Sequence, residues 1–449
     1  MVDSAATTPT PMVVSARQHW WANARVSFFW MVIVAFGVRF GYIMIGHTYR
    51  FHSGRSHPIQ ANEKNFGFGF EMGRIGRSLA QGQGFSNPFN ETTGPTAWEP
   101  PLYPFLIAMV FRLFGVYSRT SAILLLSINS IFSALTCIPI FLIAKKCFAE
   151  KVAVWSSWTW ALLPSVIFWC TRWVWETSLA TLLLAVIFLL TLTMDEEDGL
   201  KPWLQFGLIW GVAALTNTAL VSFLPVSGLW IWYRRTKLGK PSLGGVVVAS
   251  LVFAACVTPW LVRNYHTFGQ FVFIRSNFGA ELRLGNGPGA DGTWMDYLHP
   301  TKNAFEMRRY QELGELAYVA ERKREAMAYI REDYARFAGL SLRRFIYYWV
   351  GLPKASENPV QFFFRISLFA ASSLLTFWGL GRALRKHKPG AWLFFWLLLS
   401  YPLVYYLVFP HPRYRHPIEP ELGILIIYAI LEAVPLCTFV SFVVDALNP

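Results

Sequence analysis

Three glutamates stand beside long apolar segments, where a carboxylate is unfavourable without a specific reason. They are Glu71, Glu99 and Glu176. A carboxylate next to a membrane-spanning segment is costly unless it is paired or lines a wet cavity. Desolvation there raises its pKa, which suits a general base. We therefore expect these three side chains to be catalytic, and the alternative is a structural ion pair with an arginine such as Arg74 or Arg172.

Basic residues near the end of the chain have the spacing of an anion site. Arg413 and Arg415 lie two residues apart between Pro412 and Pro417, and proline disfavours a helix interior. In an extended stretch, residues two apart point the same way, so both guanidiniums would face one phosphate. Arg263 is a weaker candidate of the same kind. The alternative for these arginines is snorkelling to lipid headgroups.

The sequence gives little support for a metal or an organic cofactor. Glu71 and Glu176 could share a divalent cation, but two carboxylates do not identify one. The glycine-rich run 285–289 opens no helix after a strand and is therefore no nucleotide-binding fingerprint. No cofactor is predicted beyond this alternative of a divalent cation.

The composition indicates a membrane protein. The chain has 449 residues, of which 54% are hydrophobic and 15% charged, whereas soluble domains average about 25% charged residues. Mean hydropathy is +0.36. This balance excludes a disordered chain, a nucleic-acid-binding domain and an ordinary cytosolic enzyme. The net charge of +14 first indicates cytoplasmic anchoring.

Apolar segments long enough to cross a bilayer recur along the chain. A spanning helix needs about 20 mostly apolar residues, and we count about ten such segments. The predicted fold is an all-α integral membrane bundle. The segments are Val26–Ile45, Ser121–Ala144, Val152–Cys170, Thr177–Leu192, Trp203–Asn217, Ala219–Trp232, Leu243–Val262, Phe362–Gly381, Trp392–Phe409 and Leu422–Val440.

Short basic loops predict the orientation. They fall on one side if both termini are cytoplasmic, which leaves two long segments outside. The domain organisation follows: a cytoplasmic tail (1–25), an N-terminal module (26–262) with the first outer loop (47–120), a large outer loop (263–361), C-terminal helices (362–440) and a second cytoplasmic tail (441–449).

Both outer loops should carry helices. Helical spacing predicts one helix over Phe70–Gln81. Tyr103–Phe114 is apolar but too short to span and should be interfacial. In the second loop we expect an extended stretch, Gln270–Ile274, glycine-rich turns near Gly285–Gly292 and a helix near Ala304–Phe337.

Several short motifs, in this order and topology, resemble the GT-C superfamily of membrane glycosyltransferases. The nearest type is the bacterial protein-mannosyltransferase and aminoarabinose-transferase group, often labelled glycosyltransferase family 39-like. The resemblance covers most of residues 25–440. Its motifs are Leu79-Ala80-Gln81-Gly82-Gln83-Gly84-Phe85, Pro100-Pro101-Leu102-Tyr103-Pro104, the second-loop Glu176, Pro259-Trp260-Leu261-Val262-Arg263-Asn264 and Arg413-Tyr414-Arg415-His416-Pro417.

The resemblance implies a hexosyl- or pentosyltransferase that uses a polyprenyl-phosphate sugar donor. Transfer to a protein or glycolipid acceptor would occur on the outer face of the bacterial inner membrane and invert the anomeric centre. A first-loop acid would act as base, and residues of the motifs would bind phosphate and sugar. The implied binding residues are Tyr103, Arg263, Arg413, Tyr414, Arg415 and His416.

The chain departs from the family pattern at the predicted base. If Met72 aligns with the family's first-loop Tyr, the usual Asp position holds Phe68, and Glu71 or Glu63 would have to replace it. Glu99 precedes the Pro-Pro motif, where relatives often have Lys or Arg. Two alternatives therefore remain: a non-catalytic GT-C-like membrane protein, and a flippase or transporter of a lipid-linked glycan. Broken helices at the membrane midplane would favour the transporter.

Overall fold

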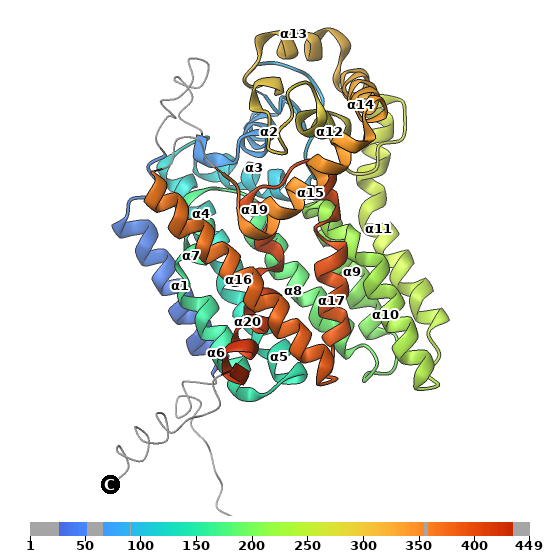
Figure 1. Ribbon diagram of the computed structural model, residues 1–449. Coiled ribbons are helices and arrows are strands. Elements are labelled where there is room, and N and C mark those ends of the chain that lie inside the picture. The colour runs from blue at the N-terminus through green and yellow to red at the C-terminus, as the bar shows by residue number, and fades with distance from the viewer. Residues whose placement is uncertain (1–26, 52–65, 90, 354–357, 434–449) are drawn as a thin grey trace, which may run out of the picture.

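The computed structural model describes residues 27–51, 66–89, 91–353 and 358–433. These residues form helices and no strand, apart from one isolated bridge between Ser86 and Pro95. A tall bundle of helices carries a cap of shorter helices at one end (Figure 1). Glu63, both predicted cytoplasmic tails (1–25 and 441–449) and the end of the last predicted span (434–440) lie outside the described residues.

The bundle contains the apolar helices. They are α1 (Phe28–Ile45), α4 (Arg119–Leu135), α5 (Cys137–Cys147), α6 (Glu150–Leu162), α7 (Pro164–Arg172), α8 (Thr177–Thr193), α9 (Lys201–Thr216), α10 (Leu224–Lys237), α11 (Leu243–Phe268), α16 (Pro359–Arg385), α17 (Ala391–Ser400), α18 (Leu403–Leu407) and α20 (Glu419–Ala433). The cap and connecting elements are α2 (Glu71–Ala80), α3 (Leu102–Phe114), α12 (Phe278–Asn286), α13 (Ala304–Leu313), α14 (Glu315–Glu332), α15 (Tyr334–Val350) and α19 (Pro412–Arg415). Short 3-10 turns are η1 (Phe66–Phe68), η2 (Thr218–Phe223), η3 (Asp296–Leu298) and η4 (His416–Ile418).

The prediction of an all-helical membrane bundle is confirmed, and each predicted span coincides with at least one helix. Four helices are long and apolar enough to cross a bilayer, or five if the α6–α7 pair, bent by 45°, is one span. Several others, including α8, are apolar but shorter. The count of about ten crossings therefore stays a prediction.

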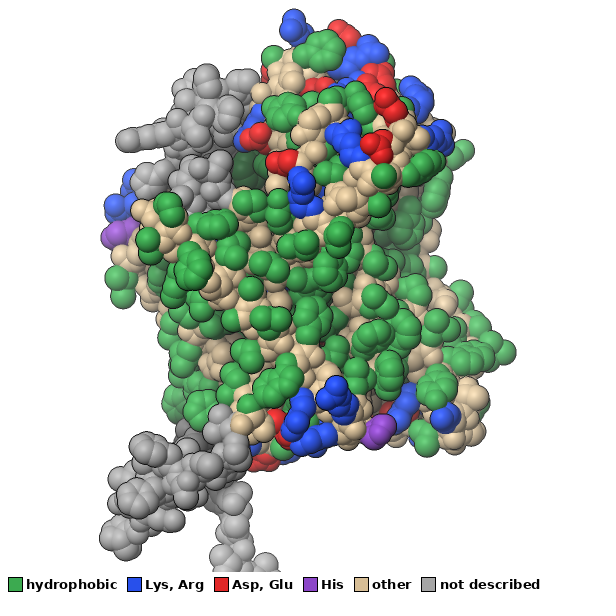
Figure 2. Space-filling view, viewed as in Figure 1, with side chains coloured by type: hydrophobic (Ala, Val, Ile, Leu, Met, Phe, Trp, Pro, Cys, Tyr) green, Lys and Arg blue, Asp and Glu red, His purple; other side chains and the backbone are tan. Residues whose placement is uncertain are grey.

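The surface has the pattern that a bilayer requires. On the face shown in Figure 2, hydrophobic side chains form a belt around the bundle, and charged side chains gather at its two ends. The exposed apolar side chains of the long helix α16 include Phe363, Leu368 and Leu374. Lipid can cover such a belt, whereas water could not do so without cost.

The short basic loops meet at the end of the bundle opposite the cap (Figure 1). Lys146 forms an ion pair with Glu196, and Arg234 pairs with Asp195 at 2.7 Å. Gly390, in the loop before α17, packs so closely that an added Cβ would lie 3.0 Å from the Cys147 sulfur. Loops that are distant in sequence therefore share one end, as the charge pattern predicts.

The expected loop helices are confirmed with one correction. Phe70–Gln81 corresponds to α2 and Tyr103–Phe114 to α3. The single helix expected over Ala304–Phe337 is wrong, because Gly314 has a positive φ of 73° and Asp333 leaves helical geometry. The segment forms α13, α14 and the start of α15, a helix that the sequence interpretation did not include.

A buried arginine stabilises the bend between α6 and α7. Arg39 of α1 is fully buried and donates hydrogen bonds to the Trp160 carbonyl at 3.1 Å and the Ala161 carbonyl at 2.7 Å. Pro164 has no N–H to donate back along the helix, which leaves acceptors free at this bend. Arg39 also donates to Ser133 Oγ. Its guanidinium therefore replaces the missing backbone donor.

We expect Arg39→Met to destabilise the bundle by about 2–3 kcal/mol, because hydrogen bonds from charged donors to buried carbonyls are lost. The measurement is thermal unfolding in detergent. Val38→Met is the matched control, since Val38 is exposed on the same helix and should melt like the wild type. An equal melting temperature for both variants would contradict this role.

Candidate active site

Acidic and basic side chains from five segments of the chain meet where the cap joins the bundle. The Glu99 carboxyl interacts electrostatically with Arg275, Glu71, Glu176 and Glu281. Arg413 interacts in turn with Glu176 and Glu99. We call this group the acidic cluster; its members are Glu71, Glu99, Glu176, Arg275, Glu281 and Arg413. All three glutamates predicted from the sequence belong to it.

Glu99 is a buried carboxyl of the acidic cluster. It lies in the loop before α3, and Arg275 Nη2 lies 3.0 Å from its Oε1. Its Oε2 is buried and accepts no hydrogen bond from the described residues. Burial raises the pKa of Glu99 to about 8 against the opposing effect of Arg275, and the neighbouring carboxylates add to the rise. At neutral pH this carboxyl is therefore protonated, which suits a proton donor better than a base.

Sequence reasoning missed two members of the acidic cluster, Arg275 and Glu281. Asn277 donates a hydrogen bond to Glu281 at 2.9 Å, and Arg275 lies 3.9 Å from the same carboxylate. Burial raises the pKa of Glu281 to about 7. The pairing of Asn277 with Glu281, four residues apart, is the one local signal that could have indicated this helix.

Glu176 precedes α8 and lies beside the break between α9 and η2. Asn217 donates a hydrogen bond to Glu176 Oε1 at 3.2 Å and also caps η2. Glu176 Oε2 is buried without a hydrogen-bond partner among the described residues. The break at residues 216–218 therefore presents a polar group to the acidic cluster.

Arg413 faces the acidic cluster without being paired. Its guanidinium carbon lies 3.8 Å from the centre of the Trp175 ring. Its Nε is buried without a hydrogen bond, and no carboxylate of the described residues lies within 4.0 Å. Burial acts to lower the pKa of Arg413, but the opposing effects of Glu176 and Tyr414 are stronger, so its pKa is raised. The cation is held by the Trp175 face and by a hydrogen bond with Tyr414, and its remaining N–H donors can bind an anion.

The extended conformation predicted for residues 413–415 is wrong. Pro412 begins a short helix, α19, because proline suits the first position of a helix. Arg415 therefore points elsewhere: it donates to Ser372 and Ser373 of α16 at 2.8 and 2.9 Å and lies over Phe369. The two guanidiniums do not converge, and a phosphate role for Arg415 stays a prediction.

Two other predicted binding residues, Arg263 and His416, have structural contacts. Arg263 donates to the backbone carbonyls of Phe85 and Thr96 and lies over Trp260 at 4.8 Å. It therefore fastens the first outer loop to α11. His416 is fully buried and hydrogen-bonds Glu419 at 2.9 Å.

The two predicted tyrosines lie closer to the acidic cluster. Tyr103 is buried and donates to Asn129 at 2.7 Å, and Asn129 donates to the Trp173 carbonyl. Tyr414 follows Arg413, stacks on Tyr405 and interacts electrostatically with Arg413, Glu281 and Arg275. Tyr103 therefore supports the loop that carries Glu176, and Tyr414 lies at the edge of the site.

Glu71 begins α2, and its Oε1 lies 3.5 Å from His299 Nε2. The first turn of a helix is a favourable place for a negative side chain. Burial lowers the pKa of His299 although Glu71 opposes this. No group of three or more His, Cys, Asp or Glu side chains suited to a metal ion occurs among the described residues. The divalent cation shared by Glu71 and Glu176 stays a prediction.

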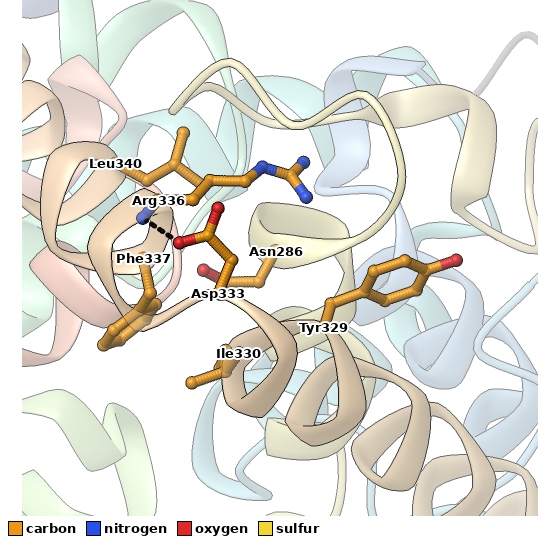
Figure 3. Close-up of a pocket in the computed structure, with 7 residues that line it drawn as sticks. All are labelled: Asn286, Tyr329, Ile330, Asp333, Arg336, Phe337 and Leu340. Carbon is orange, nitrogen blue, oxygen red and sulfur yellow. Dashed lines mark hydrogen bonds between the residues drawn. The ribbon is translucent and has the colours of Figure 1, made fainter.

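A small hollow lies away from the acidic cluster, at the junction of α14 and α15 (Figure 3). Its polar groups include Asp333, which accepts a hydrogen bond from the Arg336 backbone N–H at 2.8 Å and so caps α15. Asn286, also at this hollow, donates to the Leu407 carbonyl. Both groups serve the backbone, and this hollow is no candidate for chemistry.

Comparisons with known proteins agree with this architecture. Residues 98–262 match the model of the family described as dolichyl-phosphate-mannose-protein mannosyltransferase, over less than half of the chain. No curated protein matches the chain.

Solved membrane enzymes share its fold. The archaeal oligosaccharyltransferase AglB from Archaeoglobus fulgidus, in complex with an inhibitory peptide and a dolichol-phosphate, superposes with a TM-score of 0.54 at 13% identity, over 95% of this chain and 52% of AglB. Its apo form gives a TM-score of 0.52 at 12% identity, over 94% and 52%. ArnT from Cupriavidus metallidurans bound to undecaprenyl phosphate gives 0.35 at 13% identity, over 93% of this chain and 78% of ArnT.

The two AglB superpositions show the fold: the protein is a membrane protein with the GT-C fold. The resemblance to the protein-mannosyltransferase type is also confirmed, by the family match over residues 98–262. The chain spans about half the length of AglB.

The raised pKa values predict how stability depends on pH. In the unfolded chain Glu99 and Glu281 titrate near 4.5, against about 8 and about 7 in the fold. Between these values the folded state binds more protons, so the stability that these carboxyls contribute is lost as pH rises from about 4.5 to about 8. Between pH 6 and pH 9 we expect the melting temperature to fall less in Glu99→Gln than in the wild type.

The control for this measurement is Glu321→Gln. The hydrogen bond from Arg309 lowers the pKa of Glu321, so this carboxylate stays ionised over the whole range and its loss should leave the slope unchanged. Equal slopes for the wild type and Glu99→Gln would refute the buried, protonated state.

Proposed function

We propose that the protein is a glycosyltransferase that moves a monosaccharide from a polyprenyl-phosphate donor to an acceptor hydroxyl. The observation that carries the proposal is the Arg413 guanidinium, stacked on Trp175 and without a carboxylate partner within 4.0 Å among the described residues, beside the carboxyls of the acidic cluster. A cation held ready for an anion and carboxyls able to move a proton are the two parts that such a transfer needs.

The place of the acidic cluster supports a lipid-linked donor. It lies where the cap meets the bundle, opposite the end with the short basic loops (Figure 1). Since basic loops are retained in the cytoplasm, we assign the acidic cluster to the outer side of the membrane. The family description names a dolichyl-phosphate sugar, and AglB was solved with a dolichol-phosphate.

We propose a single displacement with inversion. The acceptor oxygen bonds to the anomeric carbon while the bond from that carbon to the phosphate oxygen breaks. The acceptor proton passes to a carboxylate, and the phosphate leaves with the lipid. Negative charge grows on the leaving phosphate, so Arg413 binds it more tightly in the transition state than in the ground state.

Glu71 and Glu176 are the proposed bases, because Glu99 is protonated at neutral pH. Glu71 begins a helix of the first outer loop, where related enzymes carry their acid, and Phe68 at the alternative position is buried in an apolar cluster. Glu176 has a free buried oxygen and lies near Arg413. A shared divalent cation would bring both carboxylates to the same acceptor.

Arg413→Ala should weaken the binding of undecaprenyl phosphate in nanodiscs by about 10- to 100-fold, because a charge-assisted contact to phosphate is lost. The measurement is a titration followed by native mass spectrometry. Arg308→Ala is the matched control, since Arg308 is exposed and its side chain contacts only its own helix. Equal affinity in both variants would exclude Arg413 from the phosphate site.

Glu71→Gln should lower kcat by about 10²- to 10⁴-fold if Glu71 is the base, with little change in KM for the donor, because a general base contributes this much. The assay follows transfer of a radiolabelled sugar from polyprenyl phosphate. The same loss in Glu176→Gln alone would assign the base to Glu176. Full turnover in both variants would remove the mechanism.

The same preparation separates the competing functions. A flippase would move a labelled lipid across a vesicle without changing it, and a non-catalytic protein would do neither. The breaks at Thr216–Thr218 and Pro164 are the features that a transporter would use. Lipid movement without sugar transfer would favour that alternative over the transferase.

A further inference from the structure

The first outer loop and the loop before α8 are joined backbone to backbone. The Val174 N–H donates to the Gly67 carbonyl at 2.8 Å. Gly69 has φ +84°, and a Cβ there would lie 2.2 Å from the Val174 carbonyl oxygen. Only glycine permits such an approach. Backbone contacts alone therefore fix the segments that lead to Glu71 and Glu176 to each other.

The residue between this junction and Glu71 is strained. Phe70 has φ 46° and ψ −113°, a conformation that a bulky residue adopts only when its surroundings impose it. Its ring stacks on Trp175, with centroids 6.2 Å apart and planes inclined by 18°. The stacking gives the start of α2, and thus Glu71, a defined position against Trp175.

Trp175 contacts three parts of the site. Arg413 lies over its ring at 3.8 Å, Phe70 stacks on it, and Glu176 is its neighbour in sequence. Trp173 stacks nearly parallel to it at 5.7 Å. Asn129 of α4 also donates a hydrogen bond to the Trp173 carbonyl, which holds the loop before α8 in place. Trp175 therefore joins the segments of both proposed bases to Arg413.

We propose that Trp175 is a positioning residue that sets the distance between the base and the phosphate-binding cation. The proposal rests on the proposed function, because it assigns Trp175 no chemistry of its own. The indole holds the Arg413 guanidinium through its π face, and Tyr414 is the hydrogen-bond partner beside it, so the remaining N–H donors of the cation can bind an anion. An ion pair in that place would hold the arginine but compete with the phosphate.

The test compares Trp175→Leu and Trp175→Phe with the wild type. We expect Trp175→Leu to lower kcat/KM for the donor by about 10- to 100-fold, since small displacements of a positioned group have effects of this size. Trp175→Phe should recover most of the loss, because it keeps an aromatic face. Trp155→Leu is the matched control, since Trp155 is exposed on α6 and should keep wild-type kinetics.

A double-mutant cycle with Arg413→Gln distinguishes positioning from general stability. If Trp175 acts through Arg413, Trp175→Leu will weaken undecaprenyl phosphate binding in the wild-type background and hardly at all in the Arg413→Gln background. Equal losses in both backgrounds would overturn the proposal, as would wild-type kinetics in Trp175→Leu. If Trp175→Leu does not fold, the same cycle is read with Trp175→Phe, whose smaller ring should still give a measurable coupling, and no coupling overturns the proposal.

Measurements on the wild-type protein distinguish a failure of the proposed function from a failure of the Trp175 proposal. A wild-type protein that neither binds undecaprenyl phosphate nor transfers sugar would overturn the proposed function and this inference with it. An active wild type with independent effects of Trp175 and Arg413 would overturn this inference alone.

Discussion

One buried carboxylate ties the two outer loops to each other. Glu315, at the start of α14, accepts hydrogen bonds from the Thr96 and Tyr310 hydroxyls, the Ala97 backbone N–H and the Ser276 hydroxyl. These donors come from both outer loops, so a single side chain fixes one loop against the other. Glu99 and Arg275 lie within two residues of these donors, and their ion pair at 3.0 Å follows from the tie.

Protonation of two buried carboxyls lowers the negative charge of the acidic cluster. It contains four carboxyls and two guanidiniums, an excess of negative charge that a poorly hydrated site cannot stabilise. Burial leaves Glu99 protonated at neutral pH and Glu281 partly so. Proton uptake by these two carboxyls lowers the negative charge around Arg275 and Arg413.

The sequence predicted what depends on local pattern. The helices 71–80 and 102–114 and the three glutamates follow from spacing and from the cost of charge near lipid. The direction of Arg415 did not follow, since proline disfavours a helix interior but suits the first position of a helix, which Pro412 occupies in α19. Arg275 and Glu281 could not be found, because the Arg275 pairing with Glu99 joins residues 176 positions apart.

The buried Arg39 also constrains how the chain is assembled in the membrane. Its carbonyl partners on α6 lie 121 and 122 positions later in the sequence, so α1 is synthesised long before they exist. An arginine near the middle of a lone spanning helix costs about 2.5–3.5 kcal/mol on insertion scales. Until α6 inserts, only the apolar residues of α1 favour its place in the bilayer. The Arg39 guanidinium and the carbonyls at the Pro164 bend therefore gain their hydrogen-bond partners only after both helices have inserted.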